Sequence, residues 1–266
     1  MIPKLAIVEW RQHAPWVEDW RVEQDLIISR ALVEIFNHPS LPKRLAFRGG
    51  TALHKLYLQP SARYSEDIDL VQMSPEPIGS VLDDLRRVLE PWLGLAKSKR
   101  SDASAKLVFR TGSEDAPPIP LRLKVEINTR DHFAEMGWAE VPLVVENQWF
   151  RGTASITSFH LDELLGTKLR ALYQRRKGRD LFDLWYATHR RSVDPSMVLR
   201  CFHRYTSSEG VSITRDDFAQ NLQEKLSYPG FVGDMRPLLR AGETYDANEA
   251  ARVVASTFIQ RLPSTR

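Results

Sequence analysis

The chain has 266 residues, and its 37 Lys plus Arg nearly balance 34 Asp plus Glu, which leaves a net charge of +3. With 42% hydrophobic and 27% charged residues, the composition is that of a globular protein and excludes a disordered polyelectrolyte. The single cysteine, Cys201, excludes an internal disulfide and a cysteine-based zinc site. Neither a signal-peptide pattern nor a membrane-spanning apolar run is present, so we expect a cytoplasmic protein with no membrane partner.

Hydrophobic periodicity predicts the elements of the first part of the chain. Apolar residues at three- and four-residue intervals predict three helices, over residues 16–36, 51–57 and 77–93. Short apolar or alternating runs predict four strands, over residues 44–47, 67–71, 106–110 and 119–127. The last of these alternates apolar with charged residues, as a strand does when one face is buried.

Strand signals stop after Phe159, and helical patterns continue to the C-terminus. We therefore expect two domains, an α/β domain with an N-terminal helix over residues 1–158 and a helical domain over residues 159–266. The fold class is α+β, with a mixed sheet, flanking helices and a C-terminal helical domain.

Three acidic residues stand where a metal-dependent phosphoryl-transfer site would need them. Asp67 and Asp69 are two residues apart on one strand and therefore project from the same face. Glu126 lies on another predicted strand and could supply a third carboxylate for Mg²⁺, which prefers oxygen ligands. An Asp-x-Asp pair alone is common in loops and edge strands, but three acids within Ser65-Glu66-Asp67-Ile68-Asp69 repel one another unless a cation is bound.

A glycine turn lies between the first strand and the next helix, in Arg48-Gly49-Gly50-Thr51. Glycines allow a phosphate to approach the backbone, and a helix N-terminus offers free N–H groups. The alternative is an ordinary tight turn in which Thr51 caps the helix.

The segment from Lys168 to Arg191 carries more net positive charge than the whole chain. This charge could contact a triphosphate and a polynucleotide backbone. In the alternative interpretation it is a solvated helix face, with Gly178 as a C-cap, Asp180 as an N-cap and Asp183 at the capping-box position. Metalloprotease, α/β-hydrolase, Walker A and dinucleotide-binding motifs are all missing from the sequence.

Three ordered motifs carry a family resemblance. They are Phe47-Arg48-Gly49-Gly50-Thr51, Ser65-Glu66-Asp67-Ile68-Asp69-Leu70, and the run from Lys168 through Arg175 and Arg179-Asp180 to Asp183. Together with Val125-Glu126-Ile127, they resemble the polymerase-β-like nucleotidyltransferases. Within that superfamily the sequence is similar to the AbiEii/AbiGii-type toxins, which include the MenT toxins, over about residues 20–190.

The resemblance implies a nucleotidyltransferase toxin of a toxin–antitoxin or phage-defence system, with a separately encoded antitoxin as partner. Similarity to MenT toxins implies transfer of NMP from an NTP to an RNA acceptor, the 3′ end of tRNA, which blocks translation. Mg²⁺, with Mn²⁺ as an alternative, would be held by Asp67, Asp69 and Glu126. The residues implied in catalysis are Asp67, Asp69, Glu126, Lys168 and Asp183, with Asp180 a competitor for the last role. The residues implied in nucleotide binding are Arg48, Gly49, Gly50, Thr51, Ser65, Lys168 and Arg179.

Two rival functions remain open from the sequence. The first is a nucleotidyltransferase that modifies a small molecule or a protein. The second is a non-catalytic binding module on the same fold, although a decayed site has no physical reason to keep its acids crowded together.

Overall fold

The computed structural model describes residues 2–264. They form two compact units, one ending at Phe159 and the other beginning at His160. Each unit buries its own set of apolar side chains. None of the helices in the described part of the chain is long and apolar enough to cross a membrane.

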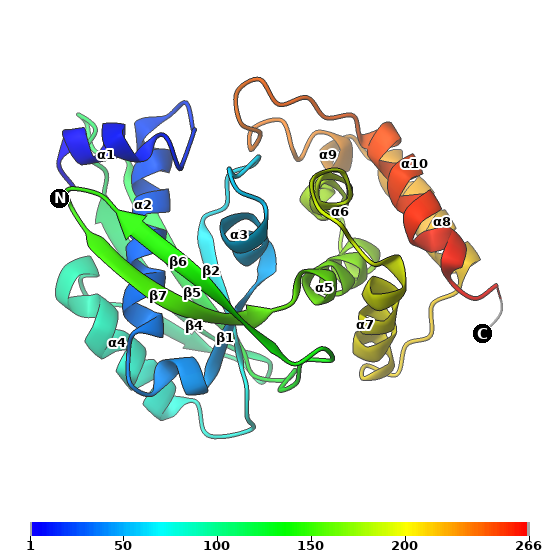
Figure 1. Ribbon diagram of the computed structural model, residues 1–266, viewed down its shortest axis with the longest axis horizontal. Coiled ribbons are helices and arrows are strands. Elements are labelled where there is room, and N and C mark those ends of the chain that lie inside the picture. The colour runs from blue at the N-terminus through cyan, green and yellow to red at the C-terminus, as the bar shows by residue number, and fades with distance from the viewer. Residues whose placement is uncertain (1, 265–266) are drawn as a thin grey trace. The chain divides into compact units, whose positions relative to one another are not determined.

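The first unit is built on a mixed seven-stranded sheet with the order β3-β4-β5-β2-β1-β7-β6 (Figure 1). Its strands are β1 Leu45–Arg48, β2 Asp67–Gln72, β3 Lys97–Arg100, β4 Ser104–Gly112, β5 Pro120–Asn128, β6 Trp138–Glu146 and β7 Arg151–Phe159. The pairs β1/β7 and β2/β5 are parallel, and the other neighbours are antiparallel. The α+β fold with a mixed sheet is therefore confirmed.

Helices cover one face of this sheet. The helical elements of the unit are α1 Lys4–Trp10, α2 Asp19–Phe36, a 3₁₀ turn Leu41–Lys43, α3 Gly49–Ala52, a π-helix Leu53–Tyr57 and α4 Gly79–Leu93. Helix α2 packs against β5, β6 and β7, while α4 packs against β4. The side chains beneath them, such as Leu107, Phe109 and Val125, are almost fully buried. Helix α3 contacts β2 and starts directly at the glycine turn.

Three strands and one α-helix of this unit were not predicted from the sequence. Strand β3 reads Lys-Ser-Lys-Arg and is exposed throughout, so it has no apolar pattern. Strand β6 contains Pro142, which is tolerated because β6 is an edge strand. Strand β7 is rich in Ser and Thr, and α1 is only 7 residues long.

The second unit is built of helices. They are α5 Leu161–Gln174, α6 Gly178–Arg190, α7 Pro195–Ser207, α8 Arg215–Leu226, α9 Pro229–Val232, α10 Ala247–Thr257 and a 3₁₀ turn Ile259–Arg261. Helix α5 packs on α6 and α7, and α6 also packs on α10. Local signals define several starts: Asp194 caps α7, and Thr214 with Asp217 forms a capping box on α8.

Candidate active site

The glycine turn and the paired aspartates lie side by side because β1 and β2 are antiparallel neighbours. Arg48, the last residue of β1, is opposite Asp69 in the register. Gly49 follows with a φ of +83°, a conformation that favours glycine. A Cβ atom on Gly49 would lie 2.5 Å from Oδ2 of Asp69, so the carboxylate rests directly against the turn.

The hydroxyl groups of this turn are already used within the protein. Oγ1 of Thr51 donates to the carbonyl oxygen of Asp67 at 2.6 Å, and it lies 2.6 Å from Oγ of Ser65. Since a hydroxyl has one proton, Ser65 is the donor in the second bond. These contacts fasten the turn to the start of β2. Thr51 is buried, so any role it has in binding a nucleotide acts through the backbone and the shape of the turn.

Asp67 and Asp69 share a sheet face with Lys124 and Glu126 of β5, because Asp67 is opposite Lys124 and Asp69 is opposite Glu126. Nζ of Lys124 lies 2.9 Å from Oδ2 of Asp67 and 3.0 Å from Oε2 of Glu126. The other oxygen of Glu126 lies 2.8 Å from Nζ of Lys106. Lys124 therefore bridges two of the acids that the sequence grouped together.

The surroundings of Asp69 and Glu126 shift the pKa values of these two carboxyl groups in opposite directions. Burial, and then the neighbouring Asp67 carboxylate, raises the pKa of Asp69 above its ordinary value. Burial also acts on Glu126, but hydrogen bonds from Lys106 and Lys124 outweigh it and hold the pKa of Glu126 below its ordinary value. Lys124 and Arg48 also act on Asp69, but they do not outweigh its burial and the Asp67 carboxylate.

The structure does not gather the three predicted acids, Asp67, Asp69 and Glu126, into one metal site. Among residues 2–264 no group of three His, Cys, Asp or Glu side chains could hold a metal ion. Both oxygens of Glu126 are paired with lysines, so the structure does not bring Glu126 into a metal site as expected. Lys124 binds one oxygen of Asp67, and Asp69 lies against Gly49, so this pair is the donor set considered for a proposed metal site.

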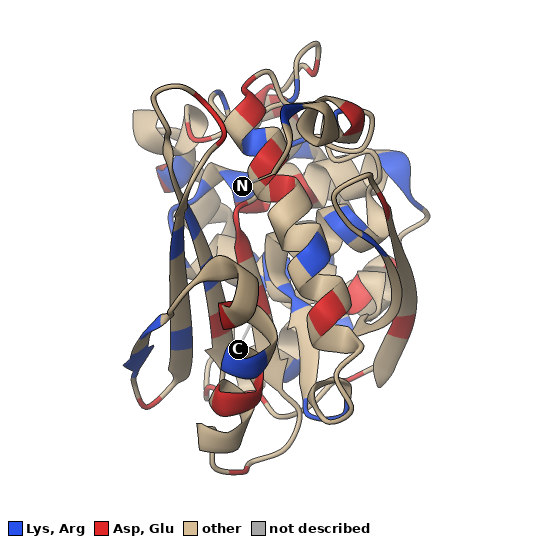
Figure 2. Cartoon of the chain, turned by 90° about the vertical axis from the view of Figure 1, so that its left-hand side faces the viewer, with Lys and Arg blue, Asp and Glu red and all other residues tan. Residues whose placement is uncertain are grey.

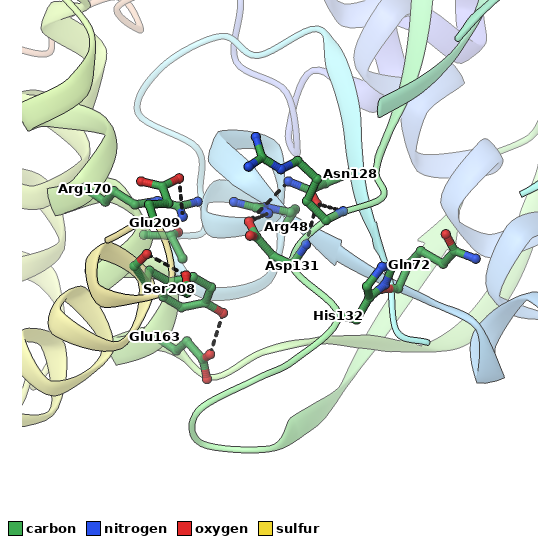
Figure 3. A network of polar contacts seen from close by, with 12 residues as sticks. Arg48, Gln72, Asn128, Asp131, His132, Glu163, Arg170, Ser208 and Glu209 are labelled. Atoms are coloured by element: carbon green, nitrogen blue, oxygen red, sulfur yellow. Dashed lines mark hydrogen bonds and ion pairs between the residues drawn. The ribbon is translucent and has the colours of Figure 1, made fainter. Parts of the chain in front are cut away.

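Arg48 presents a guanidinium group at the end of β1 (Figure 3). Its Nη1 lies 3.6 Å from Oδ2 of Asp131, and this nitrogen is buried without a hydrogen-bond partner. Asn128 holds the loop of Asp131 in place by accepting the backbone N–H groups of Arg130 and Asp131, each at 2.9 Å. About 16% of the Arg48 side chain is exposed, and a guanidinium group at this position suits a phosphate oxygen.

The other predicted residues form a buried ionic cluster in the second unit. Nζ of Lys168 in α5 lies 3.1 Å from Oδ1 of Asp180 and 2.7 Å from Oδ2 of Asp183, both in α6. Arg175 also binds both oxygens of Asp180, at 2.6 and 2.7 Å. Burial raises the pKa of Asp180, but Lys168 and then Arg175 outweigh burial and hold it below its ordinary value.

The solvated-helix interpretation of this segment is right for Arg176, Lys177, Arg190 and Arg191, which are exposed, but wrong for the predicted helix caps. Gly178 begins α6 instead of ending α5, and the N-cap is Lys177. Asp180 and Asp183 are fully buried, and Lys168 is nearly so. Arg179 is half-buried, and its backbone N–H donates to Oδ2 of Asp234 at 3.1 Å.

Sequence reasoning missed the roles of Lys124 and Arg175. The alternation of β5 already indicated that Lys124 and Glu126 share a face. The position of Lys124 beside Asp67 depends on the pairing of β5 with β2, which local sequence does not encode. Arg175 was part of the motif, but its pairing with Asp180 depends on the bend between α5 and α6.

A strand ending in a glycine turn beside a strand with two aspartates on one face places the protein in the nucleotidyltransferase class. The family model for the nucleotidyl transferase AbiEii toxin of type IV toxin–antitoxin systems matches residues 30–253. The chain therefore belongs to the AbiEii nucleotidyltransferase toxin family and is a nucleotidyltransferase. The match extends well beyond residue 190, where the recognisable motifs end. No curated protein shows significant sequence similarity.

Solved structures show the same fold. MenT4, a nucleotidyltransferase toxin from Mycobacterium tuberculosis H37Rv, superposes with a TM-score of 0.62 at 17% identity, over 98% of this chain and 91% of that one. JHP933 from Helicobacter pylori superposes with a TM-score of 0.56 at 17% identity, over 91% of each chain. At this level of identity the similarity establishes the architecture.

Proposed function

We propose that this AbiEii-family toxin transfers NMP from an NTP to an RNA acceptor, the 3′ end of tRNA, and so blocks translation. It would act in the cytoplasm, in a phage-defence or related toxin–antitoxin system, and a separately encoded antitoxin would neutralise it. The observation that carries the proposal is the Asp67–Asp69 pair lying against the Gly49 turn, with Arg48 beside it. The RNA acceptor rests on the resemblance to MenT toxins.

In the proposed reaction, an acceptor hydroxyl oxygen forms a bond to the α-phosphorus of the NTP, and the bond from that phosphorus to pyrophosphate breaks. Asp67 and Asp69 would hold a divalent cation, Mg²⁺ or Mn²⁺, which neutralises phosphate charge when bound. A carboxylate of this pair would accept the hydroxyl proton. Arg48, with the backbone of Gly49, Gly50 and Thr51, would position the phosphates.

Lys168 and Asp183 are proposed as further groups required for transfer, as a phosphate contact and an acid respectively. Asp180 is assigned a structural role because both Lys168 and Arg175 pair with it. Ser65 acts by holding Thr51. Glu126 is proposed to position Lys124 and Lys106 instead of binding metal.

The test is transfer of label to RNA. Purified protein is incubated with Mg²⁺, each α-labelled NTP in turn and total tRNA, and the RNA is resolved on a denaturing gel. We expect one NTP to label tRNA, and Asp69→Asn to lose the label while keeping its melting temperature. Asp216→Asn, which changes an exposed acid in α8, is the matched control and should retain activity.

Label that appears on no RNA, with the protein shown to be folded, would contradict the RNA acceptor. Release of pyrophosphate in the presence of small molecules or proteins would then identify the alternative acceptor class. A folded Asp69→Asn variant with full transfer would refute the site itself.

A further inference from the structure

Six basic side chains lie on one face of β3, β4 and β5, and we call this surface the basic strand face. They are Lys97, Lys99, Lys106, Arg110, Arg122 and Lys124. They share the face because Lys99 pairs with Lys106 and Arg110 pairs with Arg122 in the register, and because side chains alternate along each strand. The acidic residue that shares this face is Glu126, which Lys106 and Lys124 neutralise.

The basic strand face is open to solvent. Lys97, Lys99, Arg110 and Arg122 are exposed, whereas the opposite face of β4 and β5 is buried beneath α4 and α2. Figure 2 shows Lys and Arg following one another along neighbouring strands of the sheet. The charge is therefore concentrated on a surface that none of the helices described for residues 2–159 covers.

This surface is continuous with the proposed nucleotide site. Lys99, Lys106 and Glu126 align across the strands with Asp69. Since neighbouring strands are about 4.8 Å apart, the face extends roughly 15 Å from β2 to the edge strand β3. A chain of phosphates that leaves the aspartate pair in this direction would meet basic side chains at each step.

Like charges stand directly opposite each other at two places on the face, Lys99 with Lys106 and Arg110 with Arg122. Directly opposed like charges destabilise a sheet. Lys106 is relieved by Glu126, but Arg110 and Arg122 are both exposed and repel each other. An anion bound between them would remove this repulsion.

The basic segment of the second unit offers less of such a surface than its sequence suggests. Lys168 and Arg170 are buried, and Arg175 is bound to Asp180. Part of the positive charge of this segment is therefore buried or neutralised within the second unit. Arg176, Lys177, Arg190 and Arg191 of that segment remain exposed. The basic strand face is preferred because its four exposed cations lie on strands that align with Asp69 in the register.

We propose that the basic strand face binds the phosphate backbone of the RNA acceptor and guides its 3′ end toward Asp67 and Asp69. This proposal rests on the RNA acceptor proposed above. A polynucleotide suits the face better than an acidic protein, because the exposed large hydrophobic side chains of residues 2–264 include none from β3, β4 or β5. Protein interfaces usually have apolar anchors at their centre. Binding through phosphates would be strongly salt-dependent and independent of base sequence.

The experiment measures binding of fluorescein-labelled tRNA by anisotropy over a series of salt concentrations. Two double variants, K97Q/K99Q and R110Q/R122Q, each remove two exposed cations. We expect each to weaken binding and to reduce the slope of log K against log salt by about 1.4, from about 0.7 per lost contact with a single strand. The control K43Q/R252Q removes two exposed cations on other elements and should bind as wild type does.

Asp69→Asn separates this proposal from the proposed reaction. It should bind tRNA like the wild type while losing transfer, since Asp69 is not part of the basic strand face. The wild type could label tRNA while both double variants bind tRNA with wild-type affinity and salt slope. That result would support the RNA acceptor but would show that the basic strand face does not bind it. The face would then be assigned to an acidic protein partner. A wild type that neither binds nor labels RNA would refute both proposals.

Discussion

The backbone of Gly49 and the carboxylate of Asp69 depend on each other. We predict that Gly49→Ala destabilises the protein by about 1–2 kcal/mol, because an alanine at a φ of +83° is strained. In addition it should lose nucleotidyl transfer and Mn²⁺ binding, since the new Cβ atom would displace Oδ2 of Asp69. Urea unfolding and calorimetric titration of Mn²⁺ measure the two effects.

Gly94 provides a matched control for this substitution. It has a φ of +80° and no atom within 4 Å of a Cβ position, so Gly94→Ala carries the backbone strain without the clash. We expect a loss of stability of about 1–3 kcal/mol, because its ψ of 178° is also typical of glycine, with Mn²⁺ binding and transfer unchanged. Equal transfer by the two variants would show that the contact of Gly49 with Asp69 has no role in the site.

The residues of the site differ in how far the sequence predicts them. Asp67 and Asp69 could be grouped from their spacing alone, because the two-residue period of a strand is a local property. Glu126 was placed on the correct face, but its role changed once Lys106 and Lys124 were seen to pair with it. Those pairs depend on strand register, which is set by long-range packing.

Helices α5 and α6 are joined by the buried cluster around Asp180. We predict that Asp180→Asn lowers the free energy of unfolding by about 1–3 kcal/mol, because Arg175 loses its partner and Lys168 keeps only Asp183. Arg175→Gln should cost less, since Arg175 is about half exposed and Lys168 still neutralises Asp180. Chemical denaturation of both variants measures the difference.

A stable Asp180→Asn variant that loses transfer would contradict this structural assignment and make Asp180 the catalytic acid. The cluster also bears on Lys168→Ala, which leaves two buried carboxylates without their ammonium group. Loss of transfer in Lys168→Ala therefore supports a role of Lys168 in the reaction only if the variant is shown to be folded.

Nζ of Lys225, in α8, donates hydrogen bonds to the carbonyl oxygens of Leu172 and Tyr173 in the last turn of α5. Burial lowers the pKa of Lys225 from 10.5 to about 8. Above this value the folded state is neutral at this position while the unfolded state still binds the proton, so stability rises with pH. We predict a contribution of about 1–2 kcal/mol between about pH 8 and 9.5.

Unfolding of wild type and Lys225→Met at several pH values measures this contribution. The methionine variant cannot titrate, so its stability should lack the rise seen in the wild type over the same range. Parallel pH profiles of the two proteins would show that Lys225 is not the group responsible.

Hydrophobic periodicity predicted the helices and strands that have an apolar face. It failed for strands whose own residues show no apolar pattern. Helix α4 and strands β4 and β5 have one apolar face, and all three were predicted. Helix α2 was also predicted, although it is buried on nearly every side. The edge strands β3 and β6 bury little, and their charged residues and Pro142 are signs of an edge instead of a loop. Strand β7 is buried between β1 and β6, but its Ser and Thr residues hide the pattern.

For the whole molecule, the distribution of charge matters more than its sum. A net charge of +3 on 266 residues gives little long-range attraction for a polyanion. Basic residues that look alike in the sequence have different outcomes: Lys168 and Arg170 are enclosed in the second unit, whereas the cations at the edge of the basic strand face are open to solvent. Only the open charges can contribute to recognition of a nucleic acid.

The salt dependence of transfer should therefore reflect the length of the acceptor. We predict that transfer to intact tRNA falls steeply as salt rises, whereas transfer to a short oligonucleotide with the same 3′ end falls much less, because fewer phosphates reach the basic strand face. Initial rates at limiting acceptor and saturating NTP measure both slopes. In R110Q/R122Q the slope for tRNA should approach that for the oligonucleotide. Equal slopes for both acceptors in the wild type would mean that the enzyme recognises the 3′ end alone.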